Sequence, residues 1–149
     1  MRLAVGGDHC GYQLKAYMVD ILKAKGHEII DHGTFTGTPV DFPDIARLVC
    51  QSVLDGKAER AIMFCGTGVG AAIACNKISG IRASVCHDIH SAHQCVEHDD
   101  VQVMCLGEMI IGYTIAEELI DAFLKAEFST DEDFRRRVQK LGQMDNSLR

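Results

Sequence analysis

The sequence predicts an α/β protein in which helices cover both faces of a five-stranded parallel sheet. Short apolar segments alternate five times with segments of helical periodicity over the 149 residues. The apolar segments are hydrophobic at consecutive positions, which is typical of strands buried on both faces of a parallel sheet. We therefore expect one domain over residues 1–149, a three-layer αβα sandwich with strand order 2-1-3-4-5.

The first half of the chain divides into elements by its apolar spacing. Residues 3–7 form a continuous apolar run, and apolar side chains then repeat at helical spacing as far as Leu22. Gly26 is a typical helix stop, and the stretch after Ile30 is rich in Gly, Thr and Pro, which indicates a loop. The expected elements are strands at 3–7 and 27–30, helices at 11–25 and 45–54, and a loop at 31–43.

The second half continues the alternation and ends in a charged segment. That segment carries three acidic residues in its first turn, where they suit the helix dipole. No strand follows it, so we expect it to pack onto a neighbouring subunit. The expected elements are strands at 61–64, 81–86 and 101–106, and helices at 70–78, 87–97, 110–123 and 130–144.

Composition and charge argue against several classes of protein. The formal net charge of −6 argues against a protein held to nucleic acid by phosphate contacts. No apolar run approaches the roughly 18 residues of a membrane-spanning helix, and the first residues do not resemble a signal peptide. The 7 cysteines are odd in number and include no CxxC pair. We expect reduced thiols in a cytoplasmic protein that binds neither nucleic acid nor a membrane.

The central strand ends at Cys65 and runs into a glycine-rich loop, Gly66-Thr67-Gly68-Val69-Gly70. At the carboxyl edge of a parallel sheet, such a loop lets backbone N–H groups approach a bound anion, aided by the following helix dipole. The pKa of the Cys65 thiol is expected to fall there, which would place a thiolate base beside an oxyanion hole. The alternative is a tight turn with Cys65 as a small core residue.

Asp8 and His9 follow the first predicted strand. If that strand is the neighbour of the one ending at Cys65, both side chains lie in the same crevice as the thiol. Asp8 is also a good N-cap for the helix that follows, and the two roles are compatible.

Histidine and cysteine are dense between Cys86 and His98. Zinc prefers such ligands, but these side chains spread around a helix and no second ligand pair stands at a suitable spacing. A metal-binding module is therefore the weaker hypothesis. His98 itself is predicted in a polar turn with Asp99 and Asp100, where it is either a surface residue or a proton-transfer group.

The densest positive run in this acidic chain is Arg135-Arg136-Arg137. These side chains form either a solvated helix face or a group that captures phosphate. Asn76 and Lys77 similarly either cap the preceding helix or reach a ligand.

Several segments of the chain together resemble the ribose-5-phosphate isomerase B and galactose-6-phosphate isomerase family, in register from residue 2 to about 128. The resemblance implies a Rossmann-like αβα fold without a metal or organic cofactor. It also implies a homodimer or tetramer with active sites between subunits. The segments that carry it are 6–15, 41–43, 65–70, 76–83 and 103–107.

The resemblance also implies roles for individual residues. Cys65 would move a proton between C1 and C2 of an aldose–ketose pair through an enediolate, which the N–H groups of Gly66 to Gly70 would stabilise, Val69 included. Thr67 of this loop is also expected to be a catalytic residue. His98 of a partner subunit would open the sugar ring with help from Asp8. The phosphate would be bound by His9, Arg136 and Arg137.

The chain departs from the family pattern at several of these places. Asp99 stands where asparagine is usual, and its carboxylate would repel the enediolate unless it is protonated or turned away. Met109 and Asp133 stand where the family usually has arginine, and Phe42 replaces a tyrosine. Some members carry a glutamate base directly after the glycine loop; here that residue is Ala71, which indicates the cysteine type.

The expected function is isomerisation of a small sugar phosphate, with ribose 5-phosphate and ribulose 5-phosphate as the default pair. The departures leave open a tetrose or hexose phosphate, or an acidic sugar without phosphate. A second hypothesis is a non-catalytic subunit of a heteromeric isomerase.

Overall fold

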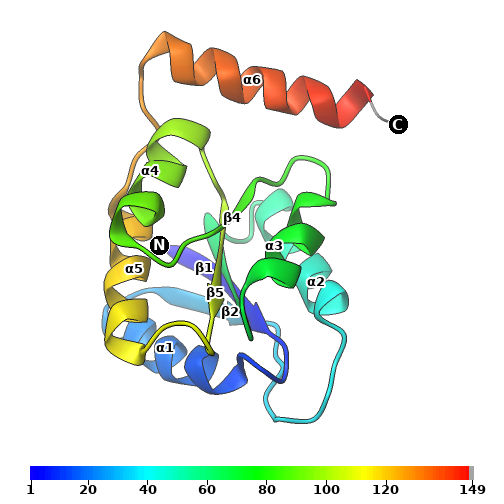
Figure 1. Cartoon of the computed structure of the whole chain (residues 1–149), viewed down its shortest axis with the longest axis vertical. Coiled ribbons are helices and arrows are strands. Elements are labelled where there is room, and N and C mark those ends of the chain that lie inside the picture. The colour runs from blue at the N-terminus through cyan, green and yellow to red at the C-terminus, as the bar shows by residue number, and fades with distance from the viewer. Residues whose placement is uncertain (148–149) are drawn as a thin grey trace.

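The computed structural model describes residues 1–147, and a five-stranded parallel sheet lies between two layers of helices (Figure 1). The expected αβα sandwich is confirmed. The strands are β1 (Arg2–Gly7), β2 (Glu28–Asp31), β3 (Arg60–Cys65), β4 (Ala83–Val85) and β5 (Val103–Gly107). The helices are α1 (Tyr12–Ala24), α2 (Phe42–Leu54), α3 (Val69–Asn76), α4 (Ile89–Asp99), α5 (Tyr113–Lys125) and α6 (Glu132–Ser147).

Alternate side chains of the strands enter two separate cores, because successive residues of a strand point to opposite faces. Leu3, Val5 and Phe64 pack with α1, α4 and α5 on one face. Ala4 and Met63 pack with α2 and α3 on the other. Both faces of the central strands are therefore buried, which explains their consecutive apolar residues.

The predicted strand order 2-1-3-4-5 is wrong at its last two positions. The order is β2-β1-β3-β5-β4, so β5 pairs with β3 and β4 lies at the edge. Every residue of β5 is buried, whereas the three residues of β4 are only partly buried. The longer, wholly apolar strand thus occupies the interior, and the short strand that contains Ser84 takes the edge. Asn76 ties that edge to α3, since its side chain donates to the Ala83 carbonyl and accepts from the Ala83 N–H.

Helix α4 begins and ends two residues later than predicted. Asp88 is its N-cap and accepts a hydrogen bond from the Ser91 N–H at 2.7 Å. Asp100 ends the helix in a left-handed conformation with φ of 49°. His98, expected in a turn, therefore lies in the last turn of α4, where its backbone is held in a fixed direction.

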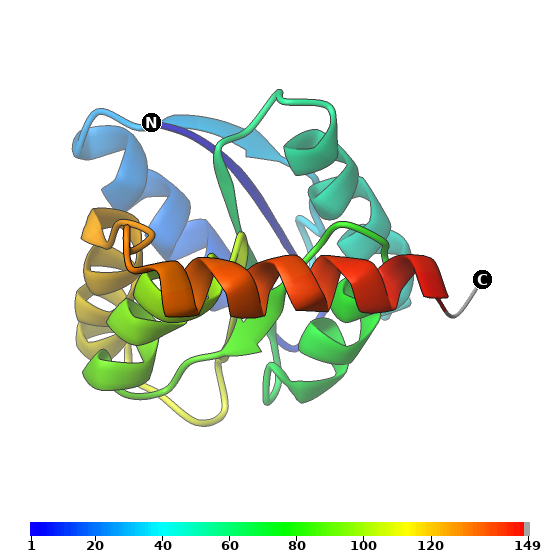
Figure 2. The ribbon, with the colours of Figure 1, turned by 90° about the horizontal axis from the view of Figure 1, so that it is seen from above.

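Helix α6 crosses the amino edge of the sheet over both helix layers (Figure 2). It packs against α4, and Asp145 near its end accepts a hydrogen bond from the Gly80 N–H at 2.7 Å. Among the helices of residues 1–147, none combines the length and apolar character needed to cross a bilayer.

Candidate active site

A buried thiol and a buried carboxylate meet at the carboxyl edge of the sheet. β1 and β3 are parallel neighbours in which Gly7 lies opposite Phe64, so the next residues, Asp8 and Cys65, emerge side by side. The Cys65 thiol donates to Asp8 Oδ2 at 3.2 Å, and the two residues are only 8% and 4% exposed. The predicted proximity of Asp8 and Cys65 is thus confirmed.

Asp8 does not cap α1. The N-cap of that helix is Gly11, which makes no side-chain cap. Instead, Asp8 Oδ1 accepts from the Cys10 N–H at 2.8 Å, within the turn that follows β1. Both carboxylate oxygens are therefore engaged, one by the backbone and one by the thiol.

The glycine loop brings backbone donors to the Cys65 sulfur. The N–H groups of Thr67 and Gly68 both direct hydrogen bonds at it. Gly68 is the N-cap of α3 with φ of 79°, and a Cβ there would lie 3.2 Å from the Leu106 carbonyl carbon. Only glycine fits without strain. The loop and the first turn of α3 thus form a donor-rich cradle for negative charge.

The expected fall in the pKa of Cys65 is wrong. Burial raises the pKa of the thiol above its ordinary value, and the hydrogen bond to Asp8 and its charge raise it further. The N–H groups of Gly68 and Thr67 act in the opposite direction but do not outweigh these effects. The thiol is consequently protonated at neutral pH in the free protein, and the thiolate, once formed, is a stronger base than an ordinary one.

The rate of Cys65 alkylation by iodoacetamide is expected to keep rising with pH through the alkaline range, because only the thiolate reacts. Asp8→Asn should move the rise to lower pH, since it removes the negative charge that opposes ionisation. The reaction can be followed by mass spectrometry of the Cys65 peptide. Thermal unfolding of both proteins checks that they are folded, so that unfolding does not expose Cys65. A plateau near neutral pH in the wild type, or an unchanged profile in the variant, would contradict this assignment.

His9 stands at the same edge, and its Nδ1 accepts a hydrogen bond from the Val40 N–H at 3.3 Å. Its proton is therefore on Nε2, which leaves that atom as a donor. Asp8, His9 and Cys10 hold ligand-type atoms within 4.8 Å of one another. The oxygens of Asp8 already accept from Cys10 and Cys65, which weakens this group as a metal site.

The segment from Cys86 to His98 does not gather three metal ligands among the described residues. His87 Nε2 accepts from the Gly107 N–H at 2.9 Å, which fixes that ring against β5. The Cys86 and Cys95 sulfurs lie 3.7 Å apart in the core, away from the exposed histidines of α4. The helix therefore spreads these side chains over different faces, as its spacing indicated.

His98 lies at the opposite edge of the sheet from Cys65. α4 leads into the amino end of β5, and strand β5 runs from there away from α6 (Figure 1). Cys65 lies at the other end of the sheet, because it pairs with Gly107 at the carboxyl end of β5. The imidazole stacks on Phe134 of α6, with ring centroids 3.9 Å apart and planes at 14°. A single chain thus does not join His98 to the Cys65 loop.

Two of the predicted phosphate ligands lie beside His98. The guanidinium carbon of Arg137 lies 5.4 Å from the centroid of the Phe134 ring, on which His98 stacks. Arg136 and Arg137 both form ion pairs with Asp133. We call these five residues (His98, Asp133, Phe134, Arg136 and Arg137) the His98 cluster. Three of its members, His98, Arg136 and Arg137, were expected at a shared site, and they lie together on the amino edge of the sheet.

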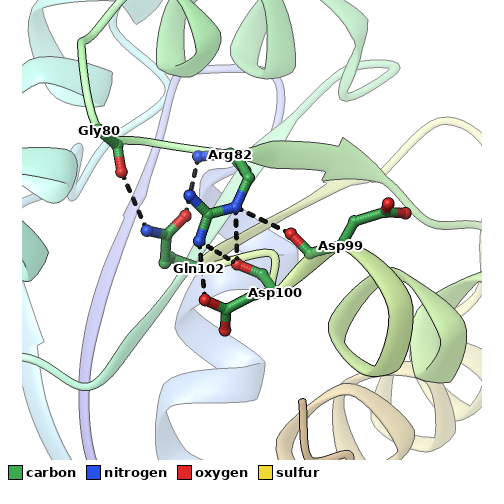
Figure 3. Close-up of polar contacts among 5 residues, drawn as sticks. All are labelled: Gly80, Arg82, Asp99, Asp100 and Gln102. Atoms are coloured by element: carbon green, nitrogen blue, oxygen red, sulfur yellow. Dashed lines mark hydrogen bonds and ion pairs between the residues drawn. The ribbon is translucent and has the colours of Figure 1, made fainter. Parts of the chain in front are cut away.

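Arg82 clamps the end of α4 that carries this cluster (Figure 3). Its guanidinium donates to the Asp99 carbonyl at 2.8 Å, and to the Asp100 carbonyl and carboxylate at 2.7 and 2.9 Å. Gln102 links the Arg82 N–H to the Gly80 carbonyl. The Asp99 carboxylate points away from this clamp and is exposed. The sequence interpretation missed the role of Arg82, although the residue belongs to a segment that carried the family resemblance.

Two apolar side chains border the Cys65 loop. Met109 Sδ lies 3.3 Å from the position that a Cβ on Gly66 would occupy, and the Met109 N–H donates to the Gly66 carbonyl at 3.0 Å. The Phe42 ring lies 3.0 Å from the corresponding position on Gly70. Met109 is 70% exposed, so it adds apolar surface at the entrance to the loop without a charge.

An αβα sandwich with a thiol–carboxylate pair under a cradle of N–H donors is suited to proton transfer on a small anionic molecule. The chain belongs to the Ribose/Galactose Isomerase family, whose model matches residues 3–141. It is therefore an enzyme of the aldose–ketose isomerase class, as the resemblance implied.

Individual relatives agree with this assignment. The chain is 40% identical over 129 residues to ribose-5-P isomerase B of Listeria innocua, with 87% of each chain covered. It is 38% identical to D-erythrulose-4-phosphate isomerase of Pectobacterium atrosepticum, over 95% of this chain and 93% of that protein. The solved structure of ribose-5-phosphate isomerase B from Clostridium thermocellum superposes with a TM-score of 0.97 at 40% identity, over 100% of both chains.

Proposed function

We propose that the protein interconverts ribose 5-phosphate and ribulose 5-phosphate by moving one proton between C1 and C2. The observation that carries the proposal is the Cys65–Asp8 pair beneath the N–H groups of Thr67 and Gly68. The ribose-5-phosphate isomerase B relatives, one of them superposing along the whole chain, support this substrate.

In the proposed mechanism, the Cys65 thiol first passes its proton to Asp8 Oδ2, which lies 3.2 Å away, and recovers it at the end of the cycle. The resulting thiolate takes the proton from C2 of the open-chain aldose, the C2–H electron pair becomes the C1–C2 double bond, and the C1 carbonyl pair moves onto its oxygen to give an enediolate. The N–H groups of the glycine loop stabilise the negative oxygen. The Cys65 thiol then returns the proton to C1, while a proton moves from the C2 oxygen to the C1 oxygen. The raised pKa of the thiol makes the thiolate a stronger base toward a weakly acidic C–H, while it lowers the fraction of Cys65 that is ionised at neutral pH. His9 Nε2 and the substrate-facing groups of Gly66, Val69 and Gly70 would hold the sugar.

We further propose that the site is completed by a second copy of the chain. His98, Asp99, Arg136 and Arg137 of one copy would face the Cys65 loop of the other, where His98 and Asp8 open the ring. The two halves lie on opposite edges of one chain, which a homodimer can bring together. Exposed apolar side chains support an interface, since Val69, Ile73 and Leu141 are 52%, 57% and 41% exposed. A cavity of about 460 Å³ between α6 and the sheet edge, beside Asp99, provides room for partner side chains.

The presence of both halves in one chain favours a homomeric enzyme over a non-catalytic subunit of a heteromeric isomerase. We also place the enzyme in the cytoplasm. All seven cysteines are free thiols, and this is typical of a reducing compartment.

A second candidate substrate is a tetrose phosphate. Met109 and Phe42 border the Cys65 loop with apolar side chains, which favours a sugar with fewer hydroxyl groups. The D-erythrulose-4-phosphate isomerase relative supports this candidate.

The proposal is tested by assaying the purified chain with ribose 5-phosphate, erythrose 4-phosphate, allose 6-phosphate, galactose 6-phosphate and unphosphorylated sugars. We expect formation of ribulose 5-phosphate, and in D₂O the product should carry deuterium at C1 as seen by NMR. Turnover of another sugar alone would keep the reaction and change the substrate. No turnover of any sugar by the purified chain would refute the homomeric enzyme.

A further inference from the structure

Asp133 engages the two arginines that would receive the substrate's anionic group. Its Oδ1 lies 2.6 Å from Arg136 Nη1 and its Oδ2 lies 3.7 Å from Arg137 Nη2. The third arginine of the run, Arg135, is directed elsewhere, with its guanidinium 4.7 Å from the Phe128 ring. One carboxylate therefore already occupies both guanidinium groups beside His98.

The surroundings of His98 add further negative charge. Glu97 Oε2 lies 3.9 Å from His98 Nε2 and 3.2 Å from His93 Nε2. The exposed Asp99 carboxylate follows directly on α4. An anion that approaches the His98 cluster thus meets two guanidinium groups and at least as many carboxylates.

The charge of the incoming group decides how well it fits here. A phosphate monoester carries about −1.5 to −2 at neutral pH, whereas a sulfonate carries a single negative charge. With Asp133 beside them, Arg136 and Arg137 offer one unit of net positive charge. One anionic charge is neutralised by it, but the second charge of a phosphate dianion would lie beside the Asp133 carboxylate without a partner.

We propose that Asp133 is a specificity-determining residue that, on sugars of the same chain length, makes this subsite favour a singly charged anionic group, such as a sulfonate, over a phosphate dianion. Ribose 5-phosphate remains a substrate, and Asp133 lowers the affinity for its phosphate. The inference rests on the proposed function, because it concerns the far end of the same substrate. It also goes beyond it, because it names the charge state that the site prefers. Asp133 acts through the two arginines, which touch the anion directly.

The test compares two substrates that share a four-carbon chain and differ in the charge of the terminal group, erythrose 4-phosphate and its sulfonate analogue, 4-deoxy-4-sulfo-D-erythrose. The wild type is expected to show the higher kcat/KM with the sulfonate. Asp133→Asn, which keeps the shape and removes the charge, should raise kcat/KM for the phosphate about tenfold, mainly through a lower KM. Its effect on the sulfonate should stay below about twofold.

Glu132→Gln is the matched control, because it removes the same charge from the same turn of α6 outside the Asp133–arginine pairs. It should leave the preference between the two substrates unchanged. If neither tetrose is turned over, both are used as competitive inhibitors of ribose 5-phosphate turnover, and the ratio of their inhibition constants gives the same comparison.

A wild-type preference for the phosphate would overturn the inference, as would equal effects of Asp133→Asn on both compounds or the same gain in Glu132→Gln. These outcomes leave the isomerase assignment intact, since they presuppose turnover. Loss of the proposed function itself would look different, because no variant would then turn over any sugar of the panel.

Discussion

Replacing Cys65 by alanine is expected to lower kcat/KM for the preferred sugar about a thousandfold. The Cys65 thiol, which lies between Asp8 and the glycine loop, is the proposed group that exchanges a proton with the substrate carbon. A positioned general base raises the reaction rate about 10²–10⁴-fold. KM should change little, because binding depends on the loop N–H groups and on His9. Steady-state kinetics together with deuterium incorporation at C1 measure both effects.

Cys75→Ala is the matched control for this experiment. Cys75 is buried in the same core as Cys65 but belongs to the interior face of α3. Its loss removes a thiol of similar burial without touching the proposed site, so activity should persist. Thermal unfolding of both variants separates a catalytic loss from a folding defect. Substantial isomerase activity in Cys65→Ala would assign the base to another group.

Mixing two inactive variants is expected to restore about a quarter of the wild-type activity. In a dimer of one Cys65→Ala chain and one His98→Asn chain, one of the two sites combines an intact Cys65 with an intact His98. Random exchange makes half of the dimers mixed, and each has one working site of two. If both residues served the same chain, every site would stay defective and mixing would restore nothing.

The measurement is ribose 5-phosphate turnover before and after unfolding and refolding the two chains together. Each variant refolded alone is the control and should stay inactive. Erythrose 4-phosphate adds a further check, because its O4 is esterified and it cannot close a five-membered ring. His98→Asn is therefore expected to retain more activity on this sugar than on ribose 5-phosphate. Equal losses on both sugars would contradict ring opening by His98.

Much of the Cys65 half of the site could be predicted from local sequence patterns. The consecutive apolar residues before Asp8 and before Cys65 indicate strands buried on both faces, and parallel strands end at a common edge. The contact between Asp8 and Cys65 follows once these strands are neighbours. The glycines at 66, 68 and 70 indicate the N–H cradle, because only such a loop lets the backbone approach an anion.

Features that depend on distant neighbours escaped the prediction. The pKa of Cys65 rises because of its burial and the adjacent Asp8 charge, and neither is visible in the loop that suggested a fall. The sequence-based strand order placed β4 and β5 in each other's positions, because both strands are short and apolar in sequence. Their order depends on which strand the rest of the core can bury more completely.

The chain's periodicity and its glycine loop were enough to predict the layers of the fold and the proximity of Asp8 and Cys65, since these depend on local backbone preference and on neighbouring strands. The class of reaction was predicted from the resemblance of several segments to a known family. Folding in space was needed to show that His98 stands on the far edge of the sheet, that Arg82 clamps its helix and that Asp133 holds the arginines. These contacts join residues of separate elements, and their energies depend on distances and burial that no linear pattern contains.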